Sequence, residues 1–185
     1  MQPEKFKTLS ESEVPESWKI IFYKEYLRFP AQPLAPKELQ AKLTDLLVYR
    51  ESRREFKGEA ISFENFSTIL HYSAGLKKES EESSQEKRYY PSAGARYPVE
   101  IYSVVNNVSN LEKGLYHFNV KNDSVERLLK GDLKDEVENL LGSKMGSEAG
   151  AVLFLTGVLS RTEVKYRANA YRFALLEAGH IGQNI

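Results

Sequence analysis

Residues 88–102 read RYYPSAGARYPVEIY, and they join a turn of small side chains to the start of a strand. Pro91 and Pro98 restrict the backbone on either side of residues 92–95, and an arginine stands close to each end of this turn. A backbone with so few side-chain atoms can contact a flat molecule closely and offer it free amide groups. We therefore expect a planar, negatively charged ligand against the turn. The open alternative is an ordinary turn into a strand, where the same residue types are common.

The segments that follow this turn predict a sheet. Residues 99–106 (VEIYSVVN) have the composition of a largely buried strand. The segments 114–120 and 124–129 flank Lys121–Asp123 and predict a hairpin with Asn-Asp in its turn. The continuous apolar run at 149–158 (AGAVLFLTGV) is typical of a central strand.

Apolar residues at helical spacing predict helices around this sheet. A short amphipathic helix is expected at 18–27 and a second at 37–48, with a proline-rich extended segment between them. Ser62 is expected to cap a third helix, and 133–141 is expected to form a further one. The charged run at 77–88 contains no apolar residue and predicts a solvated or mobile loop.

The last helix is expected to begin with a capping box formed by Ser160 and Glu163. A stripe of apolar and small residues follows at spacings of three and four: Val164, Ala168, Tyr171, Leu175, Ala178, Gly182 and Ile185. Because no glycine, proline or polar stop follows this pattern, we expect the chain to end in the middle of an element.

The composition limits the class of protein. The 185 residues suffice for one domain, and 41% of them are apolar. The formal net charge is zero, which gives no support for a nucleic-acid or membrane-surface partner, and no apolar run is long enough to span a bilayer. There is no cysteine, and His71, His117 and His180 lack the spacing of metal ligands. The amino terminus has no apolar signal segment, so a cytoplasmic location is expected.

Two further motifs carry candidate chemistry. Arg50, Ser52 and Arg54 alternate, so in an extended segment they share one side and can bind a phosphate through charge-assisted hydrogen bonds. The alternative is that these arginines face water after a helix. Lys165 and Tyr166 stand early in the last helix and can form a proton-handling pair, in which a charged lysine makes the tyrosine more acidic. The alternative is that the tyrosine packs while the lysine pairs with nearby glutamates.

These pieces together resemble a known family. RESRREF (50–56), YYPSAGARYPVEIY (89–102), GLYHFN (114–119) and KYRANAYRFALLEAGHIGQNI (165–185) are similar to the SagB-type dehydrogenases of azoline-forming clusters, which belong to the nitroreductase superfamily. The resemblance runs from about residue 46 to residue 185. It implies an α+β fold with a central, mainly antiparallel sheet flanked by helices, in an FMN-binding domain at 37–185. Residues 1–36 would form an N-terminal arm with a short helix.

The resemblance also implies an intertwined homodimer with FMN at its interface. Arg50, Ser52 and Arg54 match the motif that holds the ribityl phosphate of the flavin. Pro91, Ser92, Ala93 and Gly94 match the segment beside the isoalloxazine ring, contributed by the partner chain. Lys165 and Tyr166 match the catalytic Lys-Tyr pair of the azole-forming members. Family members continue past the GHxGQN helix, so we expect the C-terminal part of the fold to be missing, with weak flavin binding and poor stability as the result.

Three functions stay open at this point. The first is the oxidation of peptide thiazolines or oxazolines to azoles, with a peptide as substrate and flavin as hydride acceptor. The second is a generalist reduction of nitro compounds or quinones by a reduced nicotinamide, with a small molecule as the electron acceptor. The third is a flavin-free scaffold or partner subunit. Lys165 and Tyr166 favour the first, because removing a proton from carbon needs such a pair and nitroreduction does not.

Overall fold

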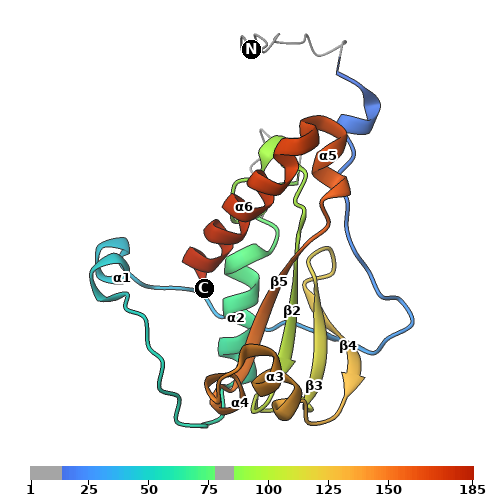
Figure 1. Ribbon diagram of the computed structural model, residues 1–185. Coiled ribbons are helices and arrows are strands. Elements are labelled where there is room, and N and C mark those ends of the chain that lie inside the picture. The colour runs from blue at the N-terminus through green and yellow to red at the C-terminus, as the bar shows by residue number, and fades with distance from the viewer. Residues whose placement is uncertain (1–13, 78–85) are drawn as a thin grey trace.

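The computed structural model describes residues 14–77 and 86–185, and its centre is one antiparallel sheet (Figure 1). The sheet has five strands in the order β1-β4-β3-β2-β5, and every neighbouring pair is antiparallel. The strands are β1 (Ala31–Pro33), β2 (Val99–Val105), β3 (Gly114–Asn119), β4 (Ser124–Lys130) and β5 (Ala151–Gly157). The predicted α+β class and the predicted hairpin are confirmed. The expected N-terminal arm and charged loop lie in part outside the described residues.

The strand predicted to be central lies at an edge of the sheet. β5 pairs with β2 along its whole length, from Val99 opposite Gly157 to Val105 opposite Ala151, and no other described strand pairs with it. Its side chains are half-buried from Ala151 to Leu155, because helices cover one face of the strand while its outer edge is open. A continuous apolar run therefore marked a strand correctly, but it did not give the position of that strand in the sheet.

Two helices cover one face of the sheet and form the core with it. They are α2 (Phe63–Ala74) and α6 (Ala170–Asn184), which lie side by side in Figure 1. Ser62 caps α2 as predicted, because its hydroxyl accepts a hydrogen bond from the backbone N–H of Asn65 at 3.1 Å. Phe66 and Leu70 of α2 and Ile181 of α6 are buried against alternate residues of β2.

The opposite face of the sheet is covered by the extended segment that follows the amino-terminal residues. The helix predicted at 18–27 is wrong: a single 3₁₀ turn at Glu16–Trp18 is followed by extended chain. The backbone groups that such a helix needs are bound elsewhere. The Arg96 guanidinium donates to the carbonyls of Ser17 and Ile20, both at 2.7 Å, and the backbone N–H of Tyr26 donates to a carboxylate of β4.

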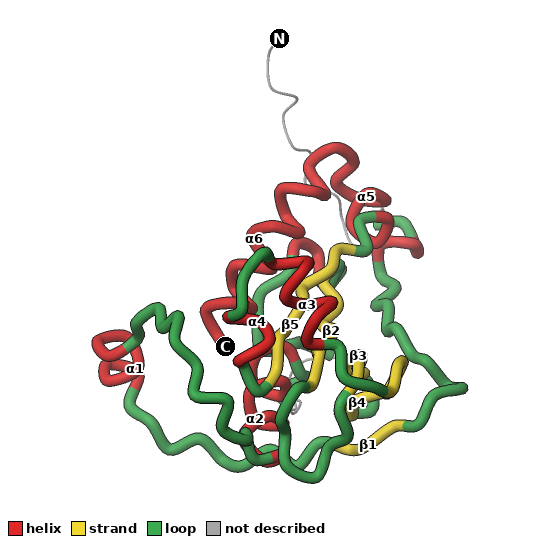
Figure 2. Tube along the Cα trace, turned by 60° about the horizontal axis from the view of Figure 1, so that its bottom comes forward, coloured by secondary structure: helices red, strands yellow, loops and turns green. Residues whose placement is uncertain are grey.

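The remaining helices lie at the ends of the molecule. α3 (Lys134–Leu141) agrees with the prediction, and the short α4 (Met145–Glu148) follows it. α1 (Leu43–Tyr49) is shorter than the helix predicted at 37–48, because Lys37 is held in extended chain by hydrogen bonds to α2. Figures 1 and 2 show α1 on an arm that stands away from the body, and residues 37–60 are all exposed.

The predicted last helix is broken in two. α5 (Ser160–Tyr166) ends at Arg167, whose φ of 47° is not helical, and α6 begins at Ala170. The predicted capping box is wrong, because Leu159 is the N-cap residue and no side chain caps α5. The buried stripe of α6 is also different from the predicted one: Ala170, Ala174, Glu177 and Ile181 face the core. The irregular turn at 167–169 resets the rotation of the helix, so a stripe extended through it points to the wrong face.

Candidate functional site

The small-residue turn adopts a backbone that few sequences allow. It contains a 3₁₀ turn at Ala93–Ala95 in which Gly94 has φ 62° and ψ 27°. Ala95 and Tyr97 also have positive φ, at 53° and 47°, a region that side chains with a Cβ rarely occupy. Such strained residues persist where the surrounding structure holds them, and they concentrate at functional sites. Here the Ser92 hydroxyl contributes by accepting the backbone N–H of Tyr97 at 2.8 Å.

This turn lies against the predicted Lys-Tyr pair of the same chain. A Cβ placed on Gly94 would stand 2.9 Å from the Tyr166 hydroxyl and 3.2 Å from both Cδ and Nζ of Lys165. Gly94 is itself exposed, and both side chains of the pair are half-buried. Two of the three predicted groups of site residues therefore meet on an accessible surface, with bare backbone on one side and two proton-bearing groups on the other.

Aromatic side chains lie beside the pair. The Lys165 ammonium lies 5.0 Å from the ring centroid of Trp18 and 5.5 Å from that of Tyr166. The Tyr166 ring packs edge-on against Phe173 of α6 at 4.8 Å. Trp18 was missed by the sequence reasoning because it comes from a segment distant in sequence, which only tertiary contacts bring to the site.

The electrostatics of Tyr166 differ from the prediction. Burial raises the pKa of the Tyr166 hydroxyl, and the neighbouring Glu177 adds to this rise. The charge that lowers this pKa comes from Arg96, and it does not outweigh burial. The pKa of Tyr166 is thus raised where the sequence predicted a lower one, and Lys165 is not among the causes of this shift. Tyr166 keeps its proton at neutral pH.

The two arginines beside the turn serve the chain itself. Arg96 is buried and binds the two carbonyls of the N-terminal segment described above. Arg88 is also buried, with its guanidinium 4.7 Å from the ring centroid of Tyr97 and within hydrogen-bonding distance of the Tyr90 hydroxyl at 3.3 Å. Neither arginine is free to bind an anionic ligand, so an anion at this turn needs its charge partner from elsewhere.

Glu177 is a further residue of this site, and the sequence analysis counted it only among the glutamates with which Lys165 could pair. Its Oε1 accepts the Ser92 hydroxyl at 2.8 Å and the backbone N–H of Ala93 at 3.2 Å. The residue is only 3% exposed, and its Oε2 has no hydrogen-bond partner among the described residues. Burial raises the pKa of this carboxyl group to about 7. The available signal in the sequence is a lone acid within the apolar stretch FALLEAG.

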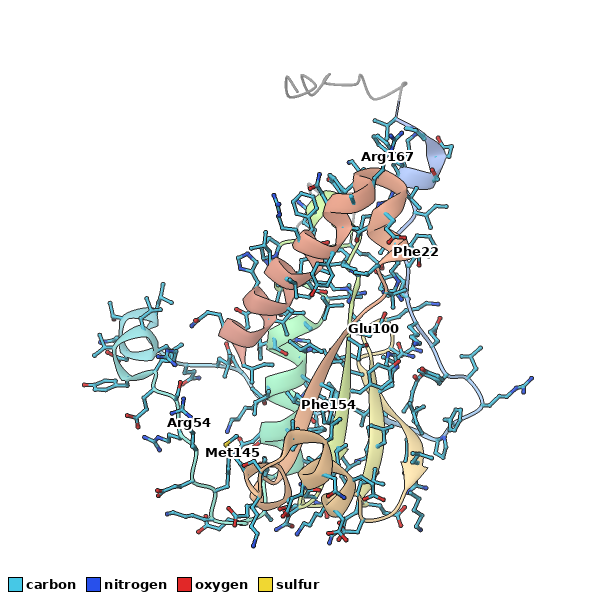
Figure 3. The ribbon with its side chains drawn as sticks, in the orientation of Figure 1. Phe22, Arg54, Glu100, Met145, Phe154 and Arg167 are labelled. Carbon is cyan, nitrogen blue, oxygen red and sulfur yellow. The ribbon has the colours of Figure 1, made fainter. Side chains whose placement is uncertain are left out.

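A buried polar network joins the sheet to α5. His117 lies between two carboxylates, with Nδ1 2.9 Å from Glu126 and Nε2 2.9 Å from Glu100. Glu100 forms an ion pair with Arg161 at 2.5 Å, and Arg161 also donates to the carbonyl of Tyr97 at 2.9 Å. Figure 3 shows Glu100 in the middle of the molecule, below α5. Since Arg161 stands one turn before Lys165, this network fixes the helix that carries the pair.

The predicted phosphate motif lies far from the turn within one chain. Arg50 is the C-cap residue of α1, and residues 50–54 are all exposed. Figure 3 places Arg54 on the arm at the left, and it places Arg167, the residue after Tyr166, at the upper end. The structure therefore brings together Lys165, Tyr166 and the turn, and it does not bring Arg50, Ser52 and Arg54 to them.

Two apolar hollows flank β5. One has a volume of about 370 Å³ and is lined by residues of α2, α4 and β5, together with Phe56 and Ile185. The other has a volume of about 200 Å³ and lies between β5 and α6, where Leu155, Leu159 and Tyr171 line it.

Within 14–77 and 86–185, no helix has the length and apolarity that a membrane span requires.

The fold and the comparisons with known proteins define the class of this protein. The nitroreductase family model matches residues 47–185, which include every strand except β1. The chain is also 31% identical over 147 residues to MJ1384 of Methanocaldococcus jannaschii, which is named as a nitroreductase; the match covers 79% of this chain and 72% of that protein. The chain belongs to the nitroreductase family.

Two further relatives carry names of peptide-processing proteins. The trifolitoxin-processing protein TfxB of Rhizobium leguminosarum is 31% identical over 105 residues, and the microcin B17-processing protein McbC of Escherichia coli is 29% identical over 105 residues. Each match covers 53% of this chain, but only 28% of TfxB and 38% of McbC. The chain thus corresponds to a minor part of either protein.

Solved structures share the fold. A nitroreductase-named protein of Anabaena variabilis superposes with a TM-score of 0.72 at 24% identity, over 88% of this chain and 34% of that chain. The E. coli microcin synthetase McbBCD complex, solved with truncated pro-MccB17 bound, gives a TM-score of 0.55 at 21% identity over 80% of this chain and 58% of that chain. These similarities confirm the nitroreductase-like fold.

Proposed function

We propose that this protein is an FMN-dependent oxidoreductase that oxidises peptide azolines to azoles. The observation that carries the proposal is the contact of Gly94 with Lys165 and Tyr166, because it sets two proton-handling groups beside an accessible backbone. The similarity to two relatives named for processing a peptide toxin and a microcin supports a peptide substrate.

The residues present fit a flavin mononucleotide. The turn offers exposed backbone at Gly94, against which a planar ring can lie without meeting a side chain of the turn. Arg50, Ser52 and Arg54 offer two guanidinium groups and a hydroxyl, a donor set that suits a phosphate ester. When bound, FMN would supply the acceptor for a hydride from the substrate.

The chain's own residues would handle the proton that leaves the substrate carbon. Tyr166 keeps its proton because burial raises its pKa, so it acts as a hydrogen-bond donor that orients the substrate. We therefore assign the role of base to Lys165, which accepts the proton from the substrate carbon as the neutral amine and becomes the ammonium. Trp18 packs beside Lys165 and Phe173 packs against Tyr166, which helps to hold the lysine and tyrosine in place.

A homodimer is part of the proposal. The arm with Arg50, Ser52 and Arg54 stands away from the turn of its own chain, so a second copy is needed to bring a phosphate site and a turn together. The apolar side chains of α1 support this arrangement: Leu43, Leu47 and Val48 are 71%, 61% and 74% exposed, which is unfavourable unless another surface covers them.

The test uses purified protein with added FMN and a peptide that contains a thiazoline. Retention of flavin absorbance after gel filtration, and a substrate that loses two hydrogens by mass spectrometry, are expected. K165A should retain the flavin and lose azole formation. A protein that takes up no FMN, or a K165A variant that forms azole at the normal rate, would contradict the proposal.

A second function is favoured by the family itself. The match to the nitroreductase family over 47–185 and the similarity to MJ1384 support the reduction of small nitro compounds by a reduced nicotinamide. Nitro reduction does not require a base on carbon, so it should survive in K165A. Parallel assays of both reactions on the same K165A preparation therefore separate the two functions.

A further inference from the structure

Glu177 holds the turn that the proposed function assigns to the flavin ring. Its Oε1 accepts two hydrogen bonds from adjacent residues of that turn, the Ser92 hydroxyl at 2.8 Å and the Ala93 N–H at 3.2 Å. Ser92 in turn accepts the backbone N–H of Tyr97. One carboxylate oxygen thus fixes the positions of the residues that lead into Gly94.

The second oxygen of Glu177 is buried, and it lacks a hydrogen-bond partner within 14–77 and 86–185. The residue is 3% exposed, and Oε2 makes no hydrogen bond to any described residue. A buried carboxylate oxygen without a donor is unfavourable when it carries charge, and a proton on it removes that charge. The free oxygen is therefore the atom at which this carboxyl group gains or loses a proton.

The charged and titratable groups around Glu177 leave this titration in the neutral range. Arg88, from the segment before the turn, favours the carboxylate, while Tyr90 and Tyr166 stay protonated because burial raises the pKa of each. His71 on the adjacent α2 pairs with Asp123, and Glu100 on β2 is paired with His117 and Arg161, so neither group is among the causes of the pKa shift of Glu177. With burial as the largest cause, the pKa of Glu177 is about 7.

We propose that Glu177 is a proton-linked positioning residue, whose carboxyl group holds the Ser92–Gly94 turn beside Lys165 and Tyr166. The hydrogen bonds between this carboxyl group and the turn become weaker when Oε2 takes up a proton and stronger when it releases one. As a carboxylate it accepts two charge-assisted hydrogen bonds, which are stronger than those to a neutral carboxylic acid. The turn is therefore held most firmly above neutral pH and loosens below it. Its role in flavin binding rests on the proposed function, whereas its action on the turn does not.

The first measurement is independent of flavin. In the full chain labelled with ¹⁵N, the amide resonance of Ala93 is followed by NMR from about pH 5 to about pH 9. We expect a shift with a midpoint near 7, in line with the pKa of Glu177. E177Q preserves shape and an acceptor oxygen but cannot titrate, so the shift should disappear. The matched control E163Q changes an exposed glutamate of α5 and should leave the midpoint unchanged.

A second variant protects the test against misfolding of E177Q. Ser92 donates to the carboxylate and thereby lowers the pKa of Glu177, so S92A should move the Ala93 midpoint to higher pH. The proposal is overturned if the Ala93 amide does not titrate in the unmodified protein. It is also overturned if the same titration persists in E177Q, or if S92A leaves the midpoint in place.

FMN itself is the probe for the second measurement. Fluorescence titrations across the same pH range should give an affinity that falls on acidification, by up to about tenfold per pH unit below the midpoint, and a flat profile in E177Q. The same pH profile in E177Q and in the unmodified protein would remove the positioning role in flavin binding. If the Ala93 titration behaves as expected but no FMN binds at any pH, the proposed function fails while the control of the turn by Glu177 stands.

Discussion

Replacing Gly94 by alanine tests whether the turn and the Lys-Tyr pair are in the close contact described here. The added Cβ meets two separate obstacles. The first is the backbone of residue 94, whose φ of 62° is a left-handed conformation that costs a residue with a Cβ about 1–2 kcal/mol. The new carbon would also stand 2.9 Å from the Tyr166 hydroxyl and 3.2 Å from Lys165 Nζ. Both neighbours are ends of flexible side chains, so they can move, and the contact displaces the pair more than it destabilises the fold.

The chain contains a matched control for the backbone contribution. Gly142, at the C-cap of α3, has φ 62° and ψ 25°, almost the same conformation as Gly94, and a Cβ there meets no atom of the described residues within 4 Å. G142A should therefore lose about 1–2 kcal/mol of stability from the backbone alone. This corresponds to a melting temperature lowered by roughly 2–8 °C for a domain of this size.

The comparison of the two variants isolates the contact. The melting temperature measured by circular dichroism should fall in both variants. Crowding should lower the free energy of unfolding of G94A by at most about 1–3 kcal/mol more than that of G142A. Azole formation should fall at least about tenfold in G94A, because an ångström-scale displacement of catalytic groups is costly. It should be unchanged in G142A. Equal activity in the two variants would refute the inference that Gly94 is selected for its contact with Lys165 and Tyr166.

Three further perturbations follow from the same structure. E100Q removes a buried charge partner of His117 and should cost about 3–5 kcal/mol in urea unfolding at neutral pH. Burial alone would raise the pKa of Glu100, but the hydrogen bond from His117 and the charge of Arg161 hold it below the usual 4.5. Its stabilisation is thus complete above about pH 4.5 and declines as pH falls through the lower folded-state pKa, and E100Q should lack this decline. W18A removes the ring over Lys165, so turnover should fall while the free energy of unfolding in urea stays within about 1 kcal/mol of its original value. Unchanged turnover would show that Trp18 is not part of the site. R96A removes a buried guanidinium and leaves the part-buried carbonyls of Ser17 and Ile20 without their donor, so it should cost roughly 1–3 kcal/mol in urea unfolding. Lysine should not restore this stability because it lacks the planar fork, and full restoration by R96K would contradict the explanation.

The sequence was most informative where local chemistry determines local structure. The hairpin at Lys121–Asp123, the cap at Ser62 and α3 each depend on residues close in the chain, and each was predicted. The helix expected at 18–27 failed because Arg96, far away in sequence, binds carbonyls of that segment. Tertiary hydrogen bonds outweighed a weak amphipathic pattern there.

The site divides in the same way. The turn at Ser92–Gly94 could be recognised because consecutive small residues between prolines are uncommon in a packed segment, and the structure sets it beside Lys165 and Tyr166. The role of Glu177 could not be predicted, because its burial results from the break at Arg167, which turns Glu177 toward the turn. An arginine with positive φ between two helices has no reliable signal in a single sequence.

The exposed arm at 37–60 has a consequence for how this protein would behave in solution. If α1 is covered by a second copy, as proposed, dilution uncovers its leucines. The free energy of unfolding then decreases, because assembly and folding are coupled equilibria. Proteases would then cut first within this arm, and they would cut more slowly as the protein concentration rises. Storage at high concentration would preserve the protein for a thermodynamic reason.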